Sequence, residues 1–140
     1  MRRALLGTLL LLLTCKQEDP IAATIRAVAK AAEDRDAGDV VEKLADNYAD
    51  DNGGRSQAED NLRRYFFGYR SIDIDISDLQ TYRKGPTGQA RFVVVFSGVP
   101  KEIGGLDQIL PSSAKYRFDV WLAEDKGRWK ITNAQWHPES

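Results

Sequence analysis

The chain has little of what metal, disulfide-rich and nucleic-acid-binding proteins need. It contains one cysteine, so it can form neither an internal disulfide nor a cysteine-rich zinc site. Its single histidine excludes a metal site built on two histidines, and we expect neither a metal nor any other cofactor. Lys and Arg number 20 against 21 Asp and Glu, which leaves no basic excess to neutralise nucleic-acid phosphates. The sequence therefore argues against a nucleic-acid partner.

The remaining composition is that of one globular domain. A length of 140 residues fits a single domain. Hydrophobic residues make up 42% and charged residues 29% of the chain, which excludes a disordered protein and a membrane protein with several spans.

An apolar run at residues 4–13 follows the basic start Met1-Arg2-Arg3. The run is too short to cross a bilayer as a helix, which takes about 20 residues, but it matches the apolar centre of a secretory signal. It ends at Leu12-Leu13-Thr14-Cys15, which resembles the lipobox of bacterial lipoproteins. The resemblance implies a signal peptide at residues 1–14 and a lipidated Cys15 that starts a short tether over residues 15–19. An ordinary signal peptide with an incidental cysteine is the alternative.

Lys16 bears on the destination of an exported lipoprotein. In that family an Asp directly after the lipidated cysteine favours retention in the inner membrane. In an organism with two membranes, Lys16 therefore implies delivery to the periplasmic face of the outer membrane. The membrane is then a partner that the domain reaches through its lipid anchor.

Residues 20–140 open with three amphipathic segments of helical period. Asp19-Pro20 is a helix-start signal, and Gly38 is expected to end the first helix. A capping box at residues 56–59 is expected to start the third. The expected helices cover residues 20–37, 40–48 and 57–69.

The apolar period changes from 3.6 to 2 after Ser71. Ile72-Asp73-Ile74-Asp75-Ile76 alternates as a half-buried strand does. Turns are expected at residues 84–88 and 125–127. The expected strands cover residues 72–76, 91–96, 115–123 and 128–136. Helices followed by an antiparallel meander indicate an α+β fold.

Residues 99–114 form an unusually long connection between two of these strands. Connections of this length in a compact domain are usually functional. We expect the segment to lie outside the sheet, to be dispensable for folding and to matter for binding. Its apolar residues are expected to pack against an apolar surface; they are Ile103, Leu106, Ile109 and Leu110.

The order of elements resembles the nuclear transport factor 2-like (NTF2-like) superfamily, which includes ketosteroid isomerase and SnoaL-like proteins. The stretches that carry the resemblance are residues 37–39, 44–51 and 127–131. It implies an NTF2-like, cystatin-like cone over residues 20–140, in which three N-terminal helices pack on a curved antiparallel sheet of four or more strands. The resemblance also implies an apolar cavity inside the cone. Because this fold serves enzymes, binding proteins and interaction modules, it leaves the function open.

The last expected strand supplies candidate pocket residues. If Trp129 points into the cone, as the resemblance implies, strict alternation places Asn133, Gln135 and His137 on the same wall. The alternative is that the strand leaves the core near Asn133 and these side chains are solvated. The full set of candidate pocket residues is Tyr48, Tyr65, Tyr69, Phe118, Trp129, Asn133, Gln135 and His137.

Catalysis is the weaker interpretation of these residues. His137 and Tyr48 are the acid–base and hydroxyl candidates, but no inward carboxylate is evident on the expected strands. The sequence favours a non-catalytic domain that binds a small apolar ligand or a protein. The alternatives are an isomerase- or hydrolyase-like enzyme and a scaffold lipoprotein that docks another envelope protein. The same alternation places Trp121 and Trp136 on the outer sheet face, where a homodimer or an envelope protein could dock.

Overall fold

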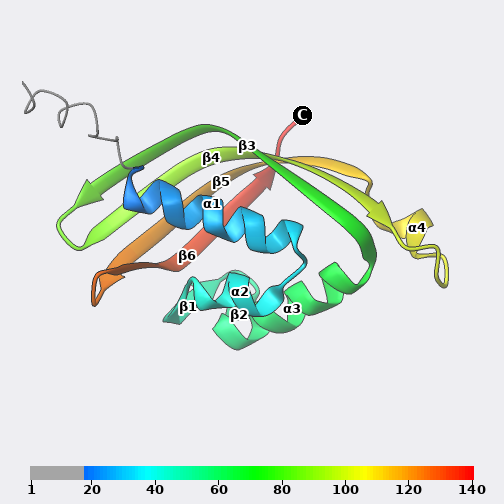
Figure 1. Ribbon diagram of the computed structural model, residues 1–140, viewed down its shortest axis with the longest axis horizontal. Helices are drawn as coiled ribbons and strands as arrows, with labels where there is room; N and C mark the ends of the chain where they lie inside the picture. The colour runs from blue at the N-terminus through cyan, green and yellow to red at the C-terminus, as the bar shows by residue number, and fades with distance from the viewer. Residues whose placement is uncertain (1–17) are drawn as a thin grey trace, which may run out of the picture.

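The computed structural model describes residues 18–140, which form four helices and a curved six-stranded sheet (Figure 1). The expected signal peptide, the expected lipidation site Cys15 and Lys16 lie outside the described residues. Within residues 18–140, no helix is long and apolar enough to cross a membrane.

Helix α1 spans Pro20–Glu33 and begins as the sequence predicts, because the Asp19 carboxylate accepts a hydrogen bond from the Ala22 amide. It ends before Gly38, contrary to expectation, because Arg35 adopts a left-handed backbone conformation that turns the chain. Helix α2 then spans Ala37–Glu42, and Gly38 lies inside it.

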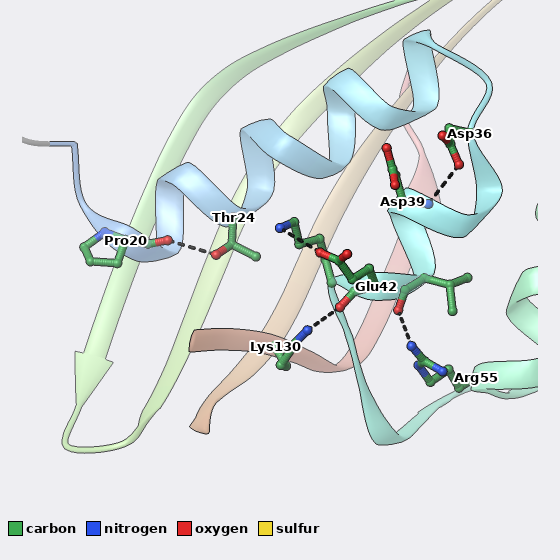
Figure 2. Close-up of polar contacts among 9 residues, drawn as sticks. Pro20, Thr24, Asp36, Asp39, Glu42, Arg55 and Lys130 are labelled. Carbon is green, nitrogen blue, oxygen red and sulfur yellow. Dashed lines mark hydrogen bonds and ion pairs between the residues drawn. The ribbon is translucent and has the colours of Figure 1, made fainter. Parts of the chain in front are cut away.

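Side-chain hydrogen bonds hold the first residues of α2 and α3 in place. The Asp36 carboxylate caps α2 by accepting a hydrogen bond from the Asp39 amide (Figure 2). Helix α3 spans Arg55–Phe67 and begins after Gly54 with no side-chain cap. The expected capping box is therefore wrong. Instead, the Arg55 guanidinium donates to the carbonyl of Val41, 3.0 Å away, and ties α3 to α2 (Figure 2).

Strand β1 spans Leu44–Asp50, where the sequence predicted the end of a helix. Leu44 and Tyr48, four residues apart, are both buried, and this spacing fits one face of a helix or of a strand equally well. The backbone of β1 is satisfied by β2 (Gly53–Gly54) and by a parallel pairing with β6 (Arg128–Pro138). Tertiary pairing therefore overrides the local helical pattern.

The whole sheet has the order β2-β1-β6-β5-β4-β3, in which β3 to β6 form an antiparallel meander. It confirms the predicted run of strands, although each strand is longer than expected. β3 spans Tyr69–Lys84, β4 spans Thr87–Pro100 and β5 spans Ser113–Asp125. A short helix α4, Leu106–Ile109, lies between β4 and β5. The sheet arches over α1, α2 and α3 (Figure 1).

The connection from β4 to β5 is more firmly attached than the sequence suggested. β4 continues to Pro100 and β5 starts at Ser113, so only residues 101–112 leave the ladder. Leu110 packs against the core near Gly68, where an added Cβ would lie 2.5 Å from its Cδ1. Ile103 and Ile109 are instead exposed. The expectation that the whole segment lies outside the sheet is wrong at both ends.

Two clusters of buried side chains form the core. The first joins Ile21 and Ile25 of α1 to Leu122 and Trp129 of the sheet. The second surrounds Tyr69, whose side chain is fully buried beside Phe66 and Phe96. A cavity lies between the helices and the sheet, bordered by members of both clusters.

Candidate functional site

The cavity has a volume of about 440 Å³ and is bordered mainly by apolar side chains. This volume lies within the range of small-molecule sites, roughly 300–1,000 Å³. Its walls come from α1, α3 and the inner faces of the strands; they include Ile25, Val28, Leu62, Ile72, Ile74, Ile76, Phe92, Val94, Phe96, Phe118 and Val120. The polar members of the lining are Tyr48, Asp50, Asn52, Asn61, Tyr65 and Tyr116.

A tyrosine–aspartate pair on β1 lies at the cavity wall. The Tyr48 hydroxyl donates to Oδ2 of Asp50 at 2.5 Å, and the Asn52 amide donates to Oδ1 at 2.7 Å. Burial raises the pKa of Tyr48, and its hydrogen bond to Asp50 raises that pKa further. Tyr48 therefore stays protonated at neutral pH and serves as a hydrogen-bond donor.

Asp50 is missed in the sequence because the apolar pattern assigns residues 40–48 to a helix and places Asp50 in the loop after it. In a strand, residues two apart lie on the same face, so Asp50 follows Tyr48 to the cavity. The available signal was this spacing: a buried tyrosine followed two residues later by an acid. Asn52 and Asn61 carried no comparable signal.

A second pair of tyrosines, Tyr65 and Tyr69, lies where α3 leads into β3. Tyr65 lines the cavity, and its ring lies 5.1 Å from that of Tyr69. Burial raises the pKa of Tyr65. Tyr69 does not line the cavity; its hydroxyl donates to the Pro111 carbonyl at 2.6 Å and holds the connection to β5 in place. Tyr69 is thus a core residue.

A β-bulge in β6 decides which residues of that strand reach the cavity. Leu122 of β5 pairs with Ile131, whereas the adjacent Trp121 pairs with Asn133, so Thr132 is an extra residue. After the bulge the alternation is inverted, and Ala134 and Trp136 line the cavity.

The prediction that Asn133, Gln135 and His137 share a wall with Trp129 is therefore wrong. The bulge turns all three side chains to the outer face. There they are paired across the strands with Trp121, Asp119 and Arg117 of β5, respectively. The Asn133 side-chain amide donates to the Ala49 carbonyl at 2.7 Å and ties β6 to β1. Before the bulge, Trp129 is buried in the first core cluster, where it is a packing residue and not part of the lining.

The bulge also separates the two tryptophans that were expected to form one docking surface. Trp136 points inward, and its ring stacks on Phe118 with 5.8 Å between centroids. Trp121 stays on the outer face. Ion pairs such as Arg91–Asp119, at 2.8 Å, and Arg117–Glu139, at 2.9 Å, cross that outer face. Of the predicted pocket residues, the structure brings Tyr48, Tyr65 and Phe118 to the cavity.

Solved structures share this architecture at low sequence identity. A proposed scytalone dehydratase from Novosphingobium aromaticivorans superposes with a TM-score of 0.75 and 10% identity, over 86% of this chain and 83% of that one. A proposed dehydratase of the NTF2-like family from Streptomyces avermitilis gives a TM-score of 0.74 and 12% identity, over 86% and 95%. The chain has the NTF2-like fold.

An uncharacterised protein with a cystatin-like fold from Caulobacter vibrioides gives a TM-score of 0.70 and 13% identity, over 87% of this chain and 89% of that one. No family model and no curated protein matches the sequence. At these identities the likeness is one of fold, so the chemistry of this NTF2-like cavity has to be argued from its own residues.

Proposed function

We propose that the domain binds a small apolar molecule inside the NTF2-like cone. The observation that supports this proposal is the open cavity of about 440 Å³, whose wall is mostly aliphatic and aromatic. A cone filled by its own side chains would leave no room for a ligand. The few polar groups at the wall, such as Asp50 and Tyr65, would orient the bound molecule.

Filling the cavity tests this proposal. Ala134 lines the cavity, and its neighbour Gln135 lies on the opposite face of the same strand. We expect Ala134→Trp to weaken binding of naphthalene-type probes at least tenfold, as measured by isothermal titration calorimetry on the full chain in detergent. Gln135→Trp is the matched control and should bind as the parent does. Circular dichroism shows whether each variant is folded, and Ala134→Leu provides a milder filling. Equal binding by parent and filled variants would refute the proposal.

Isomerase- or hydrolyase-type catalysis is a second candidate function, and the Asp50 carboxylate at the cavity wall favours it. A base that removes a proton from carbon has to face the substrate, and the Tyr48 hydroxyl holds the Asp50 carboxylate in place by donating to it. His137 has no part in this scheme, because it lies on the outer face. Solvent-deuterium exchange into small ketones, followed by NMR, tests the idea. Exchange that Asp50→Asn abolishes would support it, and exchange no faster than in buffer would contradict it.

We also propose that the full chain is exported and anchored by acyl chains on Cys15. The lipobox-like stretch before Cys15 and its place at the end of the apolar run support this proposal. Helix α1 begins five residues later, at Pro20, so the domain would lie close to the lipid surface. Cys15→Ser should release the protein from membranes and abolish labelling by palmitate. An unlabelled parent protein would end the proposal. Lys16→Asp should shift the anchored protein to the inner membrane if two membranes are present.

A further inference from the structure

Within the described part of the chain, the only charged side chain at the cavity wall is negative. Asp50 is the only acidic side chain among the lining residues that the structure describes, and none of them is Lys, Arg or His. Asp50 also takes part in none of the ion pairs found within residues 18–140. Arg55 follows β2 in sequence, but its guanidinium is engaged by the carbonyls of Leu44 and Val41. Within residues 18–140, the carboxylate therefore has no ion-pair partner.

The hydrogen bonding of Asp50 is also incomplete. A carboxylate offers about four acceptor positions. The Tyr48 hydroxyl occupies one on Oδ2 and the Asn52 amide occupies one on Oδ1. Each oxygen thus keeps acceptor capacity in a half-buried residue that borders the cavity.

Three kinds of polar group on a ligand can be compared at this position. An anionic group would be repelled by Asp50. A neutral hydroxyl would donate a hydrogen bond but leave the charge uncompensated. A protonated amine would donate to the open acceptor positions and supply the missing positive charge, which makes the hydrogen bond shorter and stronger. Aromatic rings of the same wall, Trp136 and Tyr48 among them, also attract cations.

We propose that the cavity is a site for an apolar amine, with its ammonium group paired to Asp50 and its hydrocarbon body against the aliphatic and aromatic wall. This inference rests on the proposed function, because it names the chemical class of the ligand that the cavity takes. It assigns Tyr48 a positioning role, since the hydroxyl of Tyr48 holds Oδ2 of Asp50 at the wall.

Three probes with the same hydrocarbon body test the charge preference. They are 1-naphthylmethylamine, 1-naphthalenemethanol and 1-naphthoic acid, titrated calorimetrically at pH 7 into the full chain in detergent. We expect the amine to bind at least tenfold more tightly than the alcohol, and the acid to bind most weakly. Added salt should weaken binding of the amine and leave that of the alcohol nearly unchanged.

A matched pair of variants locates the preference. Asp50→Asn keeps the size of the side chain and removes its charge, so the amine should lose its advantage over the alcohol. Asp51→Asn changes the adjacent acid, which is exposed and is not part of the lining, and should keep the advantage. If Asp50→Asn fails to fold, the comparison of the three probes and its salt dependence in the parent protein still decide the question.

The outcomes separate the two proposals. If amine and alcohol bind the parent equally, or if Asp50→Asn retains the preference, the amine inference is wrong, while the cavity function stands. If no probe binds, or if Ala134→Trp does not weaken the binding that is seen, the cavity function fails as well.

Discussion

The inner face of the sheet has a filled end and an open end, built from the same strand pair. At the filled end, Leu122 of β5 and Trp129 of β6 pack against Ile21 of α1. The helix approaches closely there because Gly88 has no side chain; an added Cβ would lie 2.5 Å from Cδ1 of Ile21. At the open end, Phe118 and Trp136 of the same two strands border the cavity. The Thr132 bulge lies between the two ends and inverts the alternation of β6.

This difference separates residues that are enclosed by the core from residues that border open space. Side chains at the filled end have partners on every side, with Ile21 1% and Leu122 2% exposed. Trp136 at the open end is 38% exposed, although its ring is large and apolar. A large aromatic side chain left partly uncovered next to a cavity is available for a ligand.

The bulge itself should have the largest effect on this comparison. Ala134 faces the cavity and Gln135 the outer side because Thr132 is an extra residue in β6. Ala134→Asp places a carboxylate against the apolar wall, and we expect stability to fall by about 4 kcal/mol or more, whereas Gln135→Asp on the outer face should cost less than about 0.5 kcal/mol. Urea unfolding measures both changes. A larger loss for Gln135→Asp than for Ala134→Asp would show that the bulge does not set the facing of the strand.

Matched leucine substitutions at the two ends should give unequal losses. Leu122→Ala removes a fully enclosed side chain, and we expect a loss of about 3 kcal/mol or more. Leu62→Ala changes a half-buried residue that already borders the cavity, and we expect about 1 kcal/mol. Chemical denaturation of both variants provides the measurement. Equal losses would mean that the open end is packed as tightly as the filled one.

Alkaline pH should destabilise the protein through the cavity tyrosines. The loss of stability per pH unit should be smaller than the loss caused by the core substitution Leu122→Ala. The folded protein holds the phenol protons of Tyr48 and Tyr65 more tightly than the unfolded chain, whose tyrosine pKa is about 10. Above pH 10 the unfolded chain therefore loses these protons first, and stability falls as pH rises, by up to about 1.4 kcal/mol per pH unit for each tyrosine. Thermal melts at pH 9 to 11 should show a shallower decline for Tyr65→Phe. An unchanged decline would contradict the assignment.

The meander could be predicted from the sequence because its signals are local. Ile72, Ile74 and Ile76 alternate with exposed residues, and Gly127 takes the positive φ of a tight turn between β5 and β6. β1 could not be predicted, because its apolar spacing fits a helix as well as a strand. The choice is made by a parallel pairing with β6, a strand far away in the sequence.

The same distinction between local signals and long-range pairing explains which site residues the sequence could predict. Tyr65 lies on a helix with a clear period and Phe118 on a strand with a clear alternation, and both border the cavity. Asp50 and Trp136 were missed because one lies on β1 and the other follows an irregularity in pairing. No glycine or proline stands at Thr132 to signal the bulge, which arises from how β5 and β6 align.

The pairing of β1 with β6 also has a consequence for the order in which the molecule assembles. Leu44 finds its partner only at Ile131, so β1 cannot join the sheet until the last strand has formed. Contacts between such distant segments form slowly, because a long loop has to close before any pairing compensates for the lost entropy. Helices and the β3–β4 hairpin can form beforehand, but Tyr48 and Asp50 reach the cavity wall only at this final step. A chain emerging from its N-terminus thus has no complete cavity wall until its final strand is available.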